Sequence, residues 1–233
     1  MPSWGIHLAC ANNIANSLNI FDIDSFLIGN FMPDAERYVV NDLSVFVPYN
    51  KSHYISKFKI NGYYENLPDY NKFIGRYKNS LNNEVILGYL THLLTDYYFN
   101  NLVFTNNTIK DSNGKIVKIK LKKNNVIDGN GESRRILKQQ DFAYFDRYIL
   151  NNYNFKLPKY SDEMLLKIHA FNEINYTKND IEKIINYLKK LSTKTNCKIH
   201  EDKFSMFSMQ ELYKEYKRCI NFVSNTLEKY ITN

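Results

Sequence analysis

The segment Asn83–Val103 constrains the fold most, because it carries the longest run of apolar side chains with helical periodicity. The apolar positions are Val85, Leu87, Leu90, Leu93, Leu94, Tyr97 and Tyr98. A helix with so many apolar side chains needs packing partners around it. The segment therefore predicts a buried central helix.

The remaining periodicity predicts that helices make up most of the chain. Gly and Pro together account for 13 of the 233 residues (8 plus 5), too few for the many tight turns of an all-β barrel. The segment Val40–Asn66 is rich in turn-forming and aromatic residues. Helical patterns are found at Ile6–Leu18, Ile23–Ile28, Leu67–Asn79, Ser133–Asn151, Ser161–Asn172, Lys178–Leu191 and Ser208–Tyr230.

One segment breaks the helical pattern. Thr108–Val126 contains the turn Asp111-Ser-Asn-Gly114 followed by alternating lysine and apolar residues, which is typical of a β-hairpin. No internal repeat or long linker divides the chain. We therefore expect an all-α, multi-helix single domain over residues 1–233, with a small β-hairpin insertion near residues 108–128.

Charge and cysteine content exclude several classes of protein. The net charge of +7 permits contact with nucleic acid or anionic lipid but does not require it. Three widely spaced cysteines, Cys10, Cys197 and Cys219, make neither a disulfide framework nor a thiolate zinc site. The sequence shows no secretory signal pattern and no uninterrupted apolar stretch of membrane-spanning length. We expect a cytoplasmic protein.

Three of the five histidines lie in the first 100 residues, near two aspartates. His92 and Asp96 are four residues apart in the predicted central helix, so they share a face and can bind one metal ion or two adjacent ones. Asp34 follows a proline at a helix end, where the fixed backbone can direct its carboxylate inward. His7 lies on the first predicted helix and His53 in the turn-rich segment. Taken singly, each residue is also typical of an ordinary core, surface or helix-capping position.

Four motifs surround these residues: Trp4-Gly-Ile-His7-Leu8, Gly29-Asn-Phe-Met-Pro-Asp34-Ala35, Ser52-His53-Tyr54 and Leu87-Gly-Tyr-Leu-Thr-His92-Leu-Leu-Thr-Asp96. In these motifs and their order, the chain resembles the zinc-dependent phospholipase C family, bacterial hydrolases of the phospholipase C/D-domain type. The motifs span the first 100 residues, a little under half of the chain. The Gly-x3-Pro-Asp and Leu-Gly-Tyr-x2-His-x3-Asp motifs are the most specific.

The resemblance implies an all-α fold of the phospholipase C type with two zinc ions. Asp34, His53, His92 and Asp96 would hold one ion, and His7 would hold the second, with Asp96 bridging the pair. Asp34 and Asp96 would be the catalytic residues. Zinc favours imidazole and carboxylate ligands, and a bridging carboxylate neutralises two closely spaced cations. The implied reaction is attack of a metal-activated water on a phosphodiester, without a covalent nucleophile.

The chain departs from the family pattern at two points. In the secreted phospholipases a terminal Trp completes the second metal site, whereas Trp4 is not terminal here, so Pro2 or water would take that position. The family also has a His soon after the His-x3-Asp motif, and this chain has none. His169 and Glu173 form a later His-x3-Glu pair that is a candidate third metal site, the alternative being a surface helical pair. Asp141 and Asp146 are rival ligands for that site.

The sequence does not identify the substrate. The resemblance implies a phosphoester, with phospholipid among the candidates. An alternative is an intracellular phosphohydrolase acting on a nucleotide or another small phosphoester with the same metal centre. The adjacent Arg134–Arg135 pair would suit a phosphate, but no sequence pattern connects it to the metal ligands.

The third alternative is a non-enzymatic module that binds polyanions. Its insertion lysines would bind nucleic acid, without specific recognition, or would contact a membrane surface peripherally. A solvated strand edge protected from aggregation explains these lysines as well. They are Lys110, Lys115, Lys118, Lys120, Lys122 and Lys123.

Overall fold

The computed structural model describes residues 2–35, 40, 43–45, 47–193 and 199–231. It is mainly helical, with 64% helix and 11% strand. The α-helices are α1 (Trp4–Ser17), α2 (Ile23–Phe31), α3 (Tyr49–Ser52), α4 (Tyr70–Tyr77), α5 (Glu84–Asn106), α6 (Gly131–Asn152), α7 (Asp162–Phe171), α8 (Lys178–Leu191) and α9 (Met209–Ile231). Short 3₁₀ turns lie at Met32–Asp34, Lys78–Ser80, Lys122–Asn124 and Glu201–Lys203.

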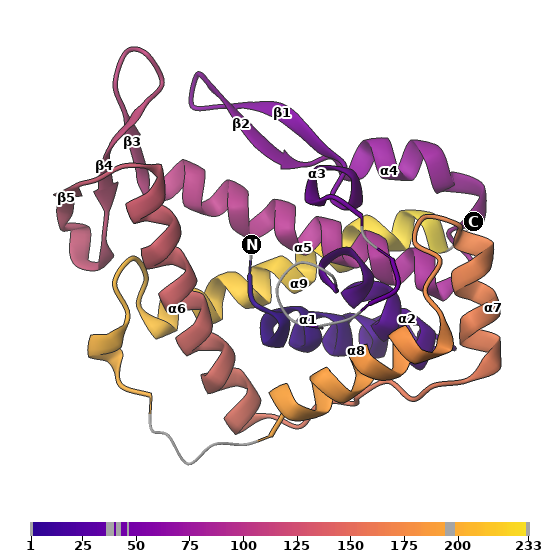
Figure 1. Cartoon of the computed structure of the whole chain (residues 1–233). Coiled ribbons are helices and arrows are strands. Elements are labelled where there is room, and N and C mark those ends of the chain that lie inside the picture. Colours follow the sequence, from indigo (N-terminus) through magenta and orange to yellow (C-terminus); the bar gives the residue numbers. More distant parts are fainter. Residues whose placement is uncertain (1, 36–39, 41–42, 46, 194–198, 232–233) are drawn as a thin grey trace.

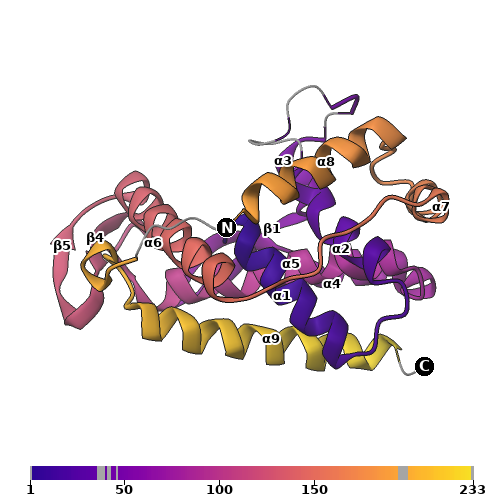
Figure 2. The ribbon, with the colours of Figure 1, turned by 90° about the horizontal axis from the view of Figure 1, so that it is seen from below.

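Helix α5 is the centre of the molecule, as the apolar periodicity predicts. Its side chains are buried from Val85 through Asp96, on all sides of the helix. Helices α1 and α2 pack on one side of it, and α9 runs alongside it (Figures 1 and 2). Helices α6, α7 and α8 complete the covering layer, and their apolar side chains join those of α1, α2 and α5 in one core. Within the described part of the chain, no helix has an apolar stretch long enough to cross a membrane.

The close approach of α2 to α5 depends on two glycines. A Cβ atom on Gly88 would lie 2.0 Å from the carbonyl oxygen of Phe26, and one on Gly29 would lie 2.1 Å from that of Val85. Neither contact leaves room for any side chain, because the obstructing atoms are backbone. The two helices therefore touch through their main chains, and this contact fixes the position of the 3₁₀ turn Met32–Asp34 relative to α5.

Capping residues set several helix starts. The Ser161 hydroxyl accepts a hydrogen bond from the Met164 N–H, and Thr177 forms a reciprocal capping box with Asp180. Both helix starts were expected from the sequence and are confirmed. Asn83 caps α5 by accepting the Val85 N–H.

Two small antiparallel sheets interrupt the helical body, so the all-α expectation is correct only as mainly α. The first is unexpected: β1 (Ile55–Ile60) pairs with β2 (Tyr63–Pro68) inside the segment interpreted as turn-rich. Their loop is Asn61–Gly62, with φ angles of 49° and 87°. These left-handed conformations match the tight hairpin turns that favour Asn-Gly.

The second sheet forms the expected insertion, with one strand more than a hairpin. Strands β3 (Thr108–Lys110) and β4 (Ile116–Lys120) flank the predicted turn, and β5 (Val126–Asp128) adds to the other edge of β4. The sheet lies at one end of the molecule, beside the start of α6 (Figure 1). Of its lysines, Lys110 pairs with Glu65, and Lys122 donates to the Glu201 carbonyl oxygen at 2.6 Å.

Candidate metal centre

The structure brings all five predicted metal ligands together in the interior. His7 comes from α1, Asp34 from the 3₁₀ turn after α2, His53 from the residue that ends α3, and His92 and Asp96 from α5. Their exposed fractions are 5% for Asp34 and at most 1% for the other four. Four segments that lie far apart in the sequence thus place three imidazoles and two carboxylates at one point.

Asp96 lies between the histidines and directs one oxygen to each side. Its Oδ1 is 3.2 Å from Nε2 of His7, and its Oδ2 is 3.4 Å from Nε2 of His53. The same Oδ2 is 3.8 Å from Nε2 of His92, one helical turn earlier on α5. This is the arrangement that a carboxylate bridging two cations requires.

Asp34 closes the other side of the cluster. Its Oδ1 is 3.2 Å from Nε2 of His53, and its Oδ2 is 3.9 Å from Nε2 of His92. The two Nε2 atoms are 3.1 Å apart. Two sets of donor atoms result, each within 4.8 Å: one from His7, His92 and Asp96, and one from Asp34, His53 and His92. His92 thus belongs to both sets.

Hydrogen bonds to the opposite ring nitrogens orient two of the imidazoles. Nδ1 of His92 lies 2.8 Å from the Asn30 carbonyl oxygen, and Nδ1 of His53 lies 2.9 Å from the Ser52 hydroxyl. An Nδ1–H that donates outward leaves Nε2 as the lone-pair donor toward the cluster. Outer contacts of this kind are typical of metal-binding histidines.

Several buried polar atoms of the cluster lack the hydrogen bonds that burial requires. Within the described chain, both ring nitrogens of His7, Oδ1 of Asp34 and both oxygens of Asp96 have no hydrogen-bond partner. Such atoms cost free energy when they are buried and unsatisfied. Cations coordinated by them would remove that cost, so these nitrogen and oxygen donors fit zinc.

Electrostatics favour the metal-binding protonation states of three of the residues, His92, Asp34 and Asp96. Burial, reinforced by the charge of His7, lowers the pKa of His92 to about 3, so its imidazole is neutral at pH 7. Burial alone would raise the pKa of each carboxyl group. The neighbouring imidazoles together lower the pKa of each carboxyl group by more than burial raises it. The pKa values of both Asp34 and Asp96 therefore lie below their usual value.

Helix α6 anchors the start of α1, which carries His7. The Asp146 carboxylate accepts the backbone N–H groups of Gly5 at 3.0 Å and of Ile6 at 2.5 Å. Burial raises the pKa of Asp146 to about 6. Asp141 accepts three backbone N–H groups, from Ser205, Met206 and Phe207. Both rival ligands therefore hold backbone segments in place.

The candidate third site is not assembled in the described structure. His169 is exposed, and its Nε2 lies 3.3 Å from the Tyr176 carbonyl oxygen. Glu173 accepts hydrogen bonds from Tyr54 and Tyr77 and pairs with Arg76 at 2.8 Å. Neither belongs to the metal-binding sets found among the described residues. Cys10 and Cys219 are buried free thiols, and Cys197 lies outside the described residues.

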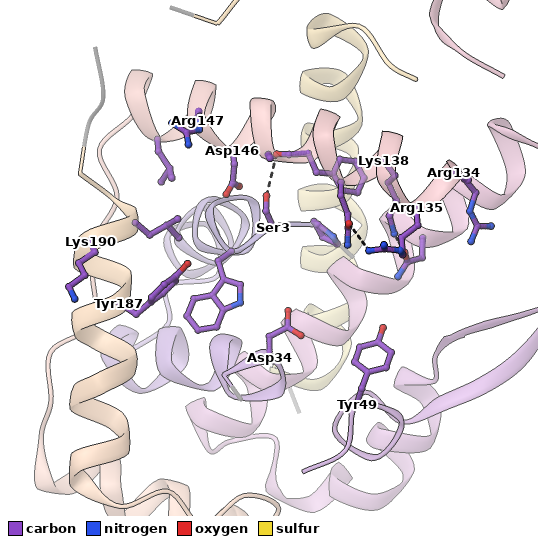
Figure 3. A pocket seen from close by; sticks show the side chains of 18 of the residues that line it. Ser3, Asp34, Tyr49, Arg134, Arg135, Lys138, Asp146, Arg147, Tyr187 and Lys190 are labelled. Carbon is purple, nitrogen blue, oxygen red and sulfur yellow. Dashed lines mark hydrogen bonds between the residues drawn. The ribbon is translucent and has the colours of Figure 1, made fainter. Parts of the chain in front are cut away.

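A cavity of about 860 Å³ reaches the centre at Asp34. Figure 3 shows Asp34 and Tyr49 on one side of it and side chains of α6 on the other. Arg134 and Arg135, which sequence reasoning left unconnected to the ligands, both line this cavity. Sequence reasoning missed several further lining residues: Tyr49, Asn100, Lys138, Arg147, Tyr187 and Lys190.

Comparisons with protein-family models, curated proteins and solved structures found no match for this chain.

Proposed function

We propose that this protein is a zinc-dependent phosphoester hydrolase of the phospholipase C class, with the corresponding type of helical fold. The observation that carries the proposal is the position of Asp96. Its two oxygens face His7 on one side and His53 and His92 on the other, and neither has a hydrogen-bond partner among the described residues. Two adjacent cations would satisfy both oxygens.

The proposed division of ligands is the one that the family resemblance implies, and the distances within the cluster are compatible with it. Asp34, His53, His92 and Asp96 would hold one zinc ion, and His7 and Asp96 would take part in holding the second. Zinc in such a site acts as a Lewis acid toward a phosphoryl oxygen and makes a hydrolytic water more acidic.

The protein itself orients the metal-binding imidazoles and provides a cavity through which a substrate can approach. The Asn30 carbonyl and the Ser52 hydroxyl fix the imidazoles of His92 and His53, so no ring has to rotate when a ligand binds. Asp34 also lines the cavity, so a phosphoester would approach the centre from that side. The volume of about 860 Å³ lies within the range of small-molecule sites.

Metal content and hydrolysis test the proposal together. Purified protein is expected to hold about two equivalents of zinc by elemental analysis and to hydrolyse bis(p-nitrophenyl) phosphate. His92→Ala should lose zinc and lower kcat/KM by about 100-fold or more, because His92 belongs to both sets of donor atoms.

His200→Ala is the matched control, because His200 is exposed and outside the centre. It should retain zinc and activity. Less than one equivalent of zinc in the wild type, unchanged by His92→Ala, would overturn the proposal. Circular dichroism of each variant verifies that the helical fold is intact.

A further inference from the structure

Among the cationic residues that α6 contributes to the cavity wall, Arg134 and Lys138 lie one helical turn apart. They face residues of α5 that follow the metal ligands. Asn100 lies four residues after Asp96, about 6 Å further along the helix, and Phe104 lies one turn beyond that. The same cavity thus runs from Asp34 to a positively charged region (Figure 3).

Contacts with α5 hold both cations in place. Nζ of Lys138 donates a hydrogen bond to Oδ1 of Asn100 at 3.2 Å. The guanidinium of Arg134 lies over the Phe104 ring, 4.2 Å from its centroid. An arginine stacked in this way keeps its planar N–H donors in a fixed direction.

In the described part of the protein neither Arg134 nor Lys138 is held in an ion pair, although Glu65 acts on Arg134 and Asp96 on Lys138, each partly offsetting the effect of burial on the pKa. Arg135, between them in sequence, pairs with Glu132 and also donates to Gln139. No ion pair joins Arg134 or Lys138 to a described carboxylate, and the buried Nη1 of Arg134 has no hydrogen-bond partner among the described residues. Burial lowers the pKa of both groups, which shows that each is partly removed from water.

Half-buried cationic hydrogen-bond donors that are fixed in direction and face a cavity suit an anionic ligand. Phosphate oxygens accept hydrogen bonds from arginine and lysine with geometry and strength that few other groups match. A zwitterionic head group would place its own positive charge against these two cations. The cavity therefore favours substrates with additional negative charge over choline-type diesters.

We propose that Arg134 and Lys138 form an anion subsite for a second phosphate group of the substrate, beside the scissile phosphoryl group at the metal centre. The substrate class is then a phosphate ester that carries a further phosphate. This inference rests on the proposed function for its role in catalysis, but the anion subsite itself can be tested without zinc.

Binding of inorganic triphosphate to zinc-free protein, measured by isothermal titration calorimetry, tests the subsite. Arg134→Gln and Lys138→Gln should each weaken binding by about tenfold or more, because each removes a charged hydrogen-bond donor. Lys138→Arg retains the charge and should bind within about threefold of the wild type. Arg218→Gln is the matched control, since Arg218 is an exposed arginine of α9 outside this cavity.

Weaker binding by Arg134→Gln and Lys138→Gln, with unchanged binding by Arg218→Gln, supports the subsite. Equal binding by the wild type and by Arg134→Gln and Lys138→Gln overturns it, as does an equal loss in Arg218→Gln. Zinc content measured on the same variants separates the two proposals: protein without zinc overturns the hydrolase but not the subsite. If phosphatidic acid vesicles compete with triphosphate for the protein, the ligand of the subsite is a lipid phosphate. If they do not compete, the ligand is the phosphate of a small soluble ester.

Discussion

The residues around the five ligands determine which atoms of the ligands can bind a metal. The Ser52 hydroxyl donates to the Tyr49 carbonyl oxygen at 3.3 Å, so its lone pairs remain available to accept the Nδ1–H of His53. That hydrogen bond selects the tautomer whose Nε2 faces Asp34 and Asp96. A serine that never touches the metal would therefore control the affinity for it.

Ser52→Ala should weaken zinc binding by about tenfold, because His53 loses the partner that fixes its tautomer and ring orientation. The measurement is competition with a chromophoric zinc chelator at pH 7. Ser56→Ala, on β1, is the control and should bind zinc as the wild type does. Unchanged zinc affinity in Ser52→Ala would show that His53 is oriented by other contacts.

At the level of elements, the main-chain contact between α2 and α5 joins the turn that carries Asp34 to the helix that carries His92 and Asp96. Gly88 lies four residues before His92, and its Cα faces the backbone of α2 at Phe26 and Asn30. The Asn30 carbonyl that orients His92 belongs to this same contact. Packing of the two helices and orientation of the ligand thus depend on the same few atoms.

Gly88→Ala should destabilise the protein by about 3 kcal/mol or more, because the new methyl group meets rigid backbone and the helices must separate. Thermal unfolding followed by circular dichroism measures the loss. Gly75→Ala on α4 is the control: its Cβ meets nothing within 4 Å, so helix propensity should stabilise the protein by about 0.5–1 kcal/mol. Equal stability of the two variants would contradict the close contact.

Elements with strong local signals could be predicted from the sequence, and the others could not. Helices α1, α5, α8 and α9 follow their apolar periodicity closely. The β1–β2 hairpin was missed although Asn61–Gly62 is a strong hairpin signal, because the aromatic residues around it obscure the alternation of the strands. Strand β5 is three residues long, too short for an alternation of apolar and polar residues to be recognised in the sequence, and its side chains are exposed.

At the level of the whole molecule, burial of the ionisable ligands makes stability depend on pH. The pKa of His92 is about 3 in the folded, zinc-free protein, whereas the ordinary pKa of a histidine is 6.5. The unfolded chain therefore binds this proton more strongly, and the stabilisation present above pH 6.5 is lost as the pH falls toward 3. The lowered pKa values of Asp34 and Asp96 add to the loss at the acid end.

Protonation of His92 should lower the melting temperature of zinc-free protein by about 3–5 °C per pH unit below pH 6.5, since one proton contributes about 1.4 kcal/mol per unit in a chain of this size. Asp146 opposes this effect below pH 6, because burial raises its pKa to about 6 and the folded state takes up its proton first. Thermal scans between pH 7.5 and pH 4 therefore compare variants: His92→Gln should lose less stability on acidification than the wild type, whereas His200→Gln should follow the wild type. The same pH profile in His92→Gln and in the wild type would contradict the burial of a neutral His92.

The sequence predicts those residues of the candidate site that lie within short local motifs, and not the others. The ligands lie within motifs of three to ten residues, so the sequence indicates all five. The wall of the cavity depends on α6 crossing the molecule to meet α1 and α5, a long-range packing arrangement that no short motif encodes. Arg134 therefore resembled an ordinary residue at a solvated helix start until the fold placed it over Phe104.

The five ligands all precede residue 97, whereas the cations opposite them belong to α6, after residue 130. Under the proposed function, the residues that hold the metal and the residues that select the substrate would therefore come from separate stretches of the chain. Substitutions of Arg134 or Lys138 would then change which anions bind and leave the five ligands in place. Asp146 of the same helix would have to be kept, because it holds the start of α1 and with it His7.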